Sequence, residues 1–175
     1  MSVSDPIQQL VTDWYQRVRE SQFSHYSAAR YYSKLHYFLG IPVVILSGIV
    51  GTSIFASIGQ QADRTSTILI GLISLLIAVL GALQTFLRFS ERAEKHRIAG
   101  ARYGEIRREI EQVQALPLNS NENLKQFLDG LRERMDGLAS EAPQLPSRFW
   151  VNREAFHLAE IKAIKKRLTL PKAEA

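Results

Sequence analysis

Two uncharged apolar runs decide the fold: residues 38–58 read FLGIPVVILSGIVGTSIFASI, and residues 66–87 read STILIGLISLLIAVLGALQTFL. A helix that rises about 1.5 Å per residue needs about 20 apolar residues to cross the hydrocarbon core of a bilayer. The seven residues between the runs, 59–65, allow only a tight reversal. The sequence therefore predicts an all-α membrane protein in which two transmembrane helices form a hairpin, with the rest of the chain on one side of the bilayer.

The alternatives to a membrane hairpin fit the sequence poorly. A soluble domain of 175 residues would have to bury two uncharged helices in succession, with little other chain to cover them. A cleaved signal peptide would begin nearer the N-terminus than residue 38, and its apolar region would be shorter than residues 38–58. We therefore expect both runs to span the membrane.

Basic residues are distributed unequally about the two runs. The connector carries only Arg64, whereas the twenty residues after the second run carry six: Arg88, Arg92, Lys95, Arg97, Arg102 and Arg107. Because segments rich in Lys and Arg stay in the cytoplasm, we expect both termini to be cytoplasmic. The net charge of +5 would then attract anionic lipid headgroups. Nucleic-acid binding, the other interpretation of a basic chain, lacks a recognition motif here.

Helical periodicity continues on both sides of the hairpin and divides the chain into four segments. They are a cytoplasmic helix that continues into the membrane (1–37), the hairpin with its crossings (38–88, with 38–58 and 66–88), a cytoplasmic extension of the second crossing (89–117) and a C-terminal helical region (118–175). The first helix should begin near Pro6, with Asp5 as its N-cap, and Pro42 is expected to kink it. The C-terminal region predicts two amphipathic helices, at residues 121–139 and 152–168.

The two cytoplasmic extensions leave the membrane side by side, so we expect them to pair as an antiparallel helical stalk. The connector midpoint sets the register: paired residues should have numbers that sum to about 126, within the range 118 to 134. This register places Tyr26 near Gly100 and Arg30 near His96. A small residue at position 100 is then expected to admit the Tyr26 ring.

Small or weakly polar side chains form a stripe along the second crossing, at steps of three and four: Thr67, Gly71, Ser74, Ala78, Gly81 and Thr85. Helices in lipid associate by close packing of small residues, so the stripe predicts a packing seam. The seam lies either within the hairpin, against Gly40, Ser47 and Gly51, or between subunits. The alternative is a narrow pore lined by the stripe, which requires an oligomer because two crossings cannot enclose a channel. Gln84 is the one amide of the second run, and we expect it to contact the other helix rather than an ion directly.

The sequence contains no recognisable set of catalytic residues, so we expect neither an enzyme nor a bound cofactor. HExxH, GxSxG and a glycine-rich phosphate loop are absent from the sequence. The histidines lack metal-ligand spacing, and the absence of cysteine excludes disulfides and a cysteine-based zinc site. His25 is expected to contact Glu94 or His96 inside the stalk, through either a satisfied hydrogen bond or a pH-sensitive one.

A series of short strings follows a recognisable order along residues 10–115. They are WYQRVRESQFSHY (14–26), LSGIVGT (46–52), LQTFLRF (83–89), ERAEKHR (91–97), ARY (101–103) and IRREIE (106–111). This arrangement resembles the bacterial SLATT superfamily of two-transmembrane proteins of conflict systems. Members of that superfamily are often encoded beside partners that make or sense nucleotides.

The resemblance implies a membrane effector of antiviral defence in the bacterial inner (plasma) membrane, which forms a pore or disrupts the membrane. We therefore expect a homo-oligomeric ion channel or pore-forming effector that is gated through its cytoplasmic helices. The alternative is a non-conducting membrane scaffold that docks a partner. A nucleotide second messenger would be read either by a sensor protein or by the basic stalk. The candidate positions for anionic lipid or phosphate are Arg88, Arg92, Lys95, Arg97 and Arg102.

Overall fold

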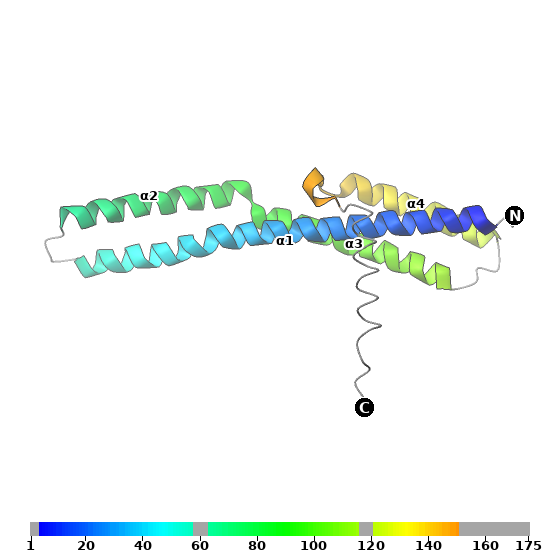
Figure 1. Cartoon of the computed structure of the whole chain (residues 1–175), viewed down its shortest axis with the longest axis horizontal. Helices are drawn as coiled ribbons and strands as arrows, with labels where there is room; N and C mark the ends of the chain where they lie inside the picture. The colour runs from blue at the N-terminus through cyan, green and yellow to red at the C-terminus, as the bar shows by residue number, and fades with distance from the viewer. Residues whose placement is uncertain (1–3, 58–62, 116–120, 151–175) are drawn as a thin grey trace, which may run out of the picture. The chain divides into compact units, whose positions relative to one another are not determined.

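Helices make up almost all of the computed structural model, which describes residues 4–57, 63–115 and 121–150 (Figure 1). Four α-helices and one 3-10 helix lie in these ranges: α1 (Ser4–Ser57), α2 (Arg64–Leu87), α3 (Phe89–Ala115), α4 (Asn121–Glu141) and η1 (Ser147–Phe149). Because these ranges contain no strand, the predicted all-α fold is confirmed.

The helix boundaries lie close to the predicted ones. α1 runs to Ser57 as one element, with Pro42 inside it. α2 begins at Arg64, slightly before the predicted crossing, because Asp63 caps it by accepting a hydrogen bond from the backbone N–H of Thr65 at 3.2 Å. α4 ends at Glu141, just beyond the predicted end. The helix predicted at residues 152–168 lies outside the described residues.

The predicted continuous helix through the second crossing and its extension is wrong at one residue. α2 ends at Leu87 and α3 begins at Phe89, with Arg88 between them in the left-handed conformation (φ 45°, ψ 44°). Among the residues that the structure describes, Arg88 is the one non-glycine residue with a positive φ. Residues 82–99 contain neither Gly nor Pro, so the sequence carries no signal for this break.

The chain folds as two compact units. The hairpin unit is Ala29–Glu94 and contains both apolar runs. The stalk unit combines Met1–Ala28 with Lys95–Ala175.

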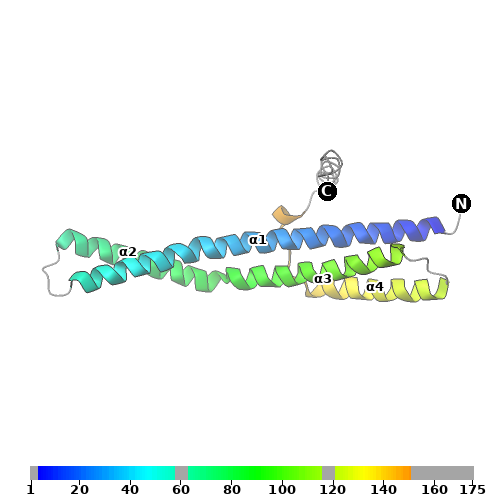
Figure 2. The same ribbon diagram turned by 90° about the horizontal axis from the view of Figure 1, so that it is seen from below.

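One face of each helix holds the hairpin unit together. α1 and α2 run side by side in both ribbon views (Figure 1, Figure 2). The less exposed positions recur at steps of three and four, as expected for two helices packed along a common seam. They are Leu39, Val43, Leu46, Val50 and Ser53 on α1, and Ile70, Ile73, Ile77, Leu80, Gln84 and Leu87 on α2, with Gly40, Gly51, Ser74 and Gly81 beside them.

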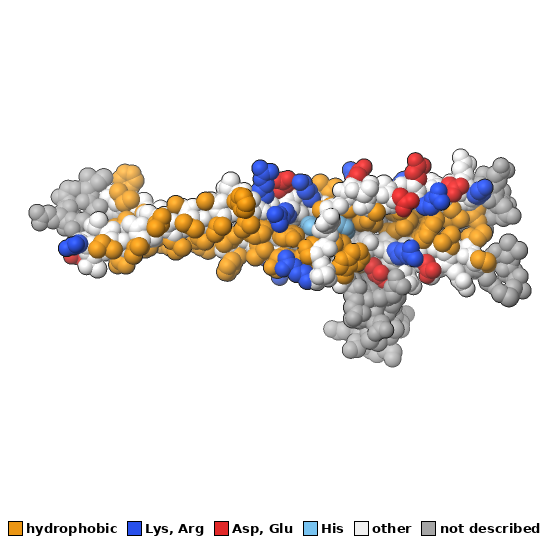
Figure 3. All heavy atoms as spheres, turned by 90° about the horizontal axis from the view of Figure 1, so that it is seen from above, with side chains coloured by type: hydrophobic (Ala, Val, Ile, Leu, Met, Phe, Trp, Pro, Cys, Tyr) orange, Lys and Arg blue, Asp and Glu red, His pale blue; other side chains and the backbone are white. Residues whose placement is uncertain are grey.

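Along the two apolar runs, the remaining surface of the hairpin unit is largely apolar (Figure 3). Val44, Phe55, Leu75 and Phe86 are 72%, 76%, 63% and 81% exposed. Only 6% and 0% of the most apolar 18-residue window in each long helical span is buried, whereas a core helix of a soluble protein would be mostly buried. Such a surface is stable in hydrocarbon, where a helix also satisfies its own backbone, so the chain is a membrane protein with two spanning helices.

Three helical segments form the core of the stalk unit: residues 4–28 of α1, residues 95–115 of α3, and α4. Their buried apolar cluster consists of Val11, Val18, Tyr103, Ile106, Ile110, Leu131 and Leu138. Leu131 and Leu138 lie on the predicted apolar face of α4, at 2% and 7% exposure. The sequence left the placement of this helix open, and the structure shows that it packs on the stalk of its own chain.

The antiparallel register agrees with the predicted one in both units. In the stalk unit, Tyr15 donates a hydrogen bond of 3.1 Å to Glu111, and the Tyr26 ring lies against Gly100; both pairs of numbers sum to 126. In the hairpin unit, Gln84 meets Gly40, a sum of 124. A Cβ atom at Gly100 would lie 3.2 Å from the Tyr26 ring, so the ring occupies the space that a side chain would need.

Substituting Gly100 by leucine is expected to destabilise the stalk unit by about 1–3 kcal/mol, because the new side chain overpacks against the Tyr26 ring. The matched control is Gly130→Leu: nothing lies within 4 Å of a Cβ there, so a gain in helix propensity of up to about 1 kcal/mol should dominate. Thermal unfolding in detergent, followed by circular dichroism, measures both. In a Tyr26→Ala background most of the cost of Gly100→Leu should vanish; an unchanged cost would contradict the contact.

Candidate functional site

The stripe of small residues lies at the edge of the hairpin seam. Ser74 and Gly81 are partly covered within the hairpin unit, whereas the other four members, Thr67, Gly71, Ala78 and Thr85, are exposed. Branched apolar side chains such as Ile73 and Ile77 form the centre of the seam on α2. Most of the stripe is therefore left for lipid or for another chain to cover.

Most glycines of the membrane-spanning helices likewise have open space where a side chain would lie. Nothing lies within 4 Å of a Cβ built at Gly48, Gly51, Gly71 or Gly81. A glycine that admits a neighbouring helix would have atoms at that distance, so the hairpin packs without needing any of these four. Ser47, which the sequence offered with Gly51 as the matching surface on α1, is exposed.

Gln84 and Gly40 do form a close contact within the hairpin unit. A Cβ atom at Gly40 would lie 2.9 Å from Nε2 of Gln84. An amide in hydrocarbon is costly unless other polar groups surround it, and the bare backbone at Gly40 gives the amide room between the helices. The structure thus places the one amide of the second crossing in the seam.

Hydroxyl groups of the spanning helices are satisfied locally. Ser47, Ser74 and Thr85 each donate to the backbone carbonyl four residues earlier, at 2.7, 2.8 and 3.1 Å. With the donor used in this way, a hydroxyl costs little in lipid, while its oxygen can still accept a hydrogen bond or face a cation. These positions are therefore compatible with lipid, with a packed helix and with the wall of a pore.

A layer of buried polar side chains crosses the stalk unit between α1 and α3. Nδ1 of His25 and Nδ1 of His96 are 3.0 Å apart, so one ring donates and the other accepts. Both side chains are 3% exposed, and Ser24 is fully buried. Tyr103 stacks on His25, with 5.5 Å between the ring centroids. Of the two partners that the sequence proposed for His25, the structure places His96 against it.

Burial keeps the histidine pair neutral. It lowers the pKa of His25 from 6.5 to about 4, and the neighbouring His96 ring contributes to the shift. Burial also lowers the pKa of His96. Within the described ranges, no group of three or more Asp, Glu or His side chains is arranged to hold a metal ion. The pair itself forms a hydrogen bond between α1 and α3.

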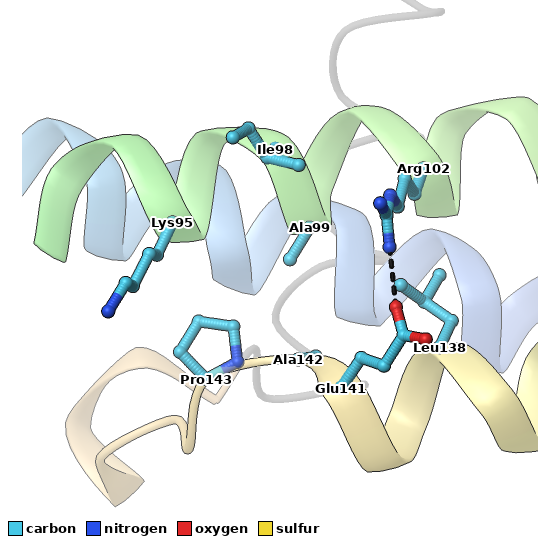
Figure 4. Close-up of a pocket in the computed structure, with 8 residues that line it drawn as sticks. All are labelled: Lys95, Ile98, Ala99, Arg102, Leu138, Glu141, Ala142 and Pro143. Carbon is cyan, nitrogen blue, oxygen red and sulfur yellow. Dashed lines mark hydrogen bonds and ion pairs between the residues drawn. The ribbon is translucent and has the colours of Figure 1, made fainter. Parts of the chain in front are cut away.

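Two of the basic residues considered for anionic ligands have acidic neighbours. Arg88 lies 3.4 Å from Glu91, and Arg102 donates a hydrogen bond of 2.6 Å to Glu141. Arg102 and Lys95 line a hollow of about 410 Å³ between α3 and the end of α4 (Figure 4). Because Glu141 also lines this otherwise largely apolar hollow and bonds to Arg102, it weakens the attraction of the hollow for an anion.

Exposed aromatic side chains mark one end of the apolar band, a feature that the sequence analysis did not use. Tyr37 and Phe38 on α1 are 62% and 75% exposed, and Phe86 on α2 is 81% exposed. The register of the hairpin brings positions 38 and 86 to the same level. Aromatic rings gather where hydrocarbon meets headgroups, so these residues indicate one boundary of the membrane-embedded part.

One comparison with known protein families gives a match over most of the chain. The model of the SMODS and SLOG-associating 2TM effector domain family 4 matches residues 7–167 of this chain. The match includes the hairpin, α3 and α4. No curated protein and no solved structure gives a significant match.

Acidification is expected to destabilise the stalk unit through the histidine pair. The unfolded chain binds a proton at His25 near pH 6.5, whereas the folded chain does so only near pH 4. The stability that the neutral ring supplies is therefore complete above pH 6.5 and is lost as the pH falls towards 4. Melting temperatures recorded by circular dichroism from pH 7.5 to pH 4 measure the loss.

The control for this experiment is the double variant His25→Leu with His96→Leu. It replaces both hydrogen-bonding partners by apolar side chains, so no polar group is left buried alone. Its stability should fall less steeply between pH 6.5 and 4, while the carboxylates titrate alike in both proteins. Parallel pH profiles would show that the pair contributes nothing to the pH dependence.

Proposed function

Because this chain belongs to the SMODS and SLOG-associating 2TM effector domain family 4, we propose that it is a pore-forming effector of a bacterial defence system. The active form is a homo-oligomer in the inner membrane whose hairpins surround a channel. Both termini are cytoplasmic, and rearrangement of the cytoplasmic helices opens the channel.

The observation that carries this proposal is the uncovered part of the small-residue stripe. Thr67, Gly71, Ala78 and Thr85 are exposed, and Gly71 has no atom within 4 Å of its Cβ position. Lipid covers large apolar side chains as well as small ones, so a monomeric hairpin gains nothing from this pattern. A second helix does gain, because small residues let backbones approach closely.

The chemistry of the stripe also suits the wall of a narrow pore. Its side chains are short, and the hydroxyls of Ser74 and Thr85 direct their protons to the backbone of their own helix. Their oxygens are left as acceptors for water or for a cation. Two helices cannot enclose a channel, so the pore requires several copies of the chain.

The distribution of basic residues supports the proposed orientation. One arginine, Arg64, lies at the connector end, whereas the segment after α2 is rich in Arg and Lys. These basic side chains include Arg92 and Arg97, which lie where the headgroups of anionic lipids would meet them. A nucleotide second messenger, if one triggers the effector, acts either on a sensor partner or on this basic region.

Ion flux from liposomes that contain the purified protein tests the proposal. We expect Gly71→Leu to abolish flux, since leucine there blocks close approach of a second helix or fills the lumen. The matched control is Gly48→Leu on α1, where a Cβ atom likewise has nothing within 4 Å. Because the two substitutions are the same and both sites are open, the fold of the hairpin should tolerate both.

Each outcome of the flux experiment separates the pore from its alternatives. Flux retained in Gly48→Leu and lost in Gly71→Leu places the conducting or packing face on α2. Equal loss in both variants contradicts that assignment. If the folded and oligomeric wild-type protein conducts neither alone nor with added cyclic nucleotides, the chain is a non-conducting scaffold and the proposal fails.

A further inference from the structure

The junction between α2 and α3 is a single residue. α2 ends at Leu87, Arg88 adopts φ 45° and ψ 44°, and α3 begins at Phe89. The first hydrogen bond of α3 runs from the backbone N–H of Arg92 to the carbonyl of Arg88 at 3.0 Å. One residue in the left-handed region is thus all that separates two right-handed helices.

The sequence at this junction favours an unbroken helix. The left-handed conformation is unfavourable for an L residue with a side chain, and arginine is a good helix former. Helix breaks of this kind are usually made by glycine, or sometimes by asparagine, and neither lies within residues 85–95. In an unbroken helix the backbone would also form the hydrogen bonds that the break interrupts.

Packing within the hairpin unit favours the bent form. Phe89, the first residue of α3, stacks on Tyr32 of α1 with 6.2 Å between the ring centroids and 21° between the ring planes. One turn further, Ala93 is 7% exposed. A right-handed Arg88 would redirect every residue that follows, so the stacking of Phe89 on Tyr32 and the burial of Ala93 both depend on the left-handed conformation.

We propose that residue 88 is a two-state hinge. In one state Arg88 is left-handed and Phe89 packs on Tyr32; in the other Arg88 is right-handed, and α2 and α3 form one continuous helix from Arg64 to Ala115. Local backbone preference favours the second state and tertiary contact favours the first, so a modest input shifts the balance. Because residue 88 lies between the spanning helix and the cytoplasmic one, we assign the hinge the role of gate in the proposed pore. This role rests on the proposed function.

A matched pair of variants isolates the effect of the backbone preference at residue 88. Arg88→Gly and Arg88→Ala remove the same guanidinium group and its ion pair with Glu91. Glycine adopts the left-handed conformation freely, whereas alanine resists it and favours the helix. The ratio of bent to straight molecules should therefore be roughly tenfold higher, or more, in Arg88→Gly than in Arg88→Ala.

Spin-label distances measure this ratio directly. The chain contains no cysteine, so Leu76→Cys and Ala101→Cys carry the only labels. A continuous helix places these two positions about 37 Å apart, and a left-handed residue between them shortens the distance. Double electron–electron resonance in lipid, with labelled protein diluted into unlabelled protein, should show the shorter distance in Arg88→Gly and a growing 37 Å population in Arg88→Ala. Identical distributions in the two variants would overturn the hinge.

Ion flux from the same two variants tests whether the hinge is a gate. If it is, the variants differ from each other in flux, with the wild-type protein between them. Differing distances with equal flux would overturn the gating role. If no variant conducts, the pore proposal fails, while the distance measurement still decides whether the hinge exists.

Discussion

The backbone of a chain in hydrocarbon has no water to bond with, and this constraint governs the rest of the molecule. Each apolar run must be a helix, since a helix satisfies its own N–H and C=O groups. A connector of seven residues then forces the two helices to lie antiparallel and adjacent. That reversal fixes which residues meet: Gln84 with Gly40 in the hairpin unit, and Tyr26 with Gly100 in the stalk unit.

Glycine has two different uses in this register. At Gly40 and Gly100 a side chain would collide with Gln84 or with the Tyr26 ring, so these glycines serve contacts inside one chain. At Gly71 there is open space, and the residue serves no contact of its own hairpin. Because glycine lowers helix propensity, an open glycine is a cost to the monomer. At Gly71, where Ala78 and Thr85 of the same stripe are also small and exposed, the proposed neighbouring helix offsets that cost.

Features that depend on periodicity and connector length were predictable from the sequence, and features that depend on a balance of small energies were not. The runs at 38–58 and 66–87 gave the hairpin, and counting from the connector gave the contact of Tyr26 with Gly100. The same count allowed sums of 118 to 134, and the hydrogen bond between His25 and His96, with a sum of 121, lies within that range. The break at Arg88 had no local signal: contacts such as the stacking of Phe89 on Tyr32, distant in sequence, oppose the helix preference of the chain.

The core of the stalk unit changes from apolar to polar along its length, and this change affects where the unit opens most easily. Towards the N-terminus of α1 its core is apolar, with Val18 and Ile110 at 1% and 0% exposure. Towards residue 95 the layer between α1 and α3 is polar, with Ser24, His25 and His96 buried together. A buried hydrogen bond adds less to stability than apolar packing of similar size, although it fixes one register. The apolar end therefore resists separation more strongly than the histidine layer does. Local opening of the stalk should begin at that layer, a few residues along α3 from the break at Arg88.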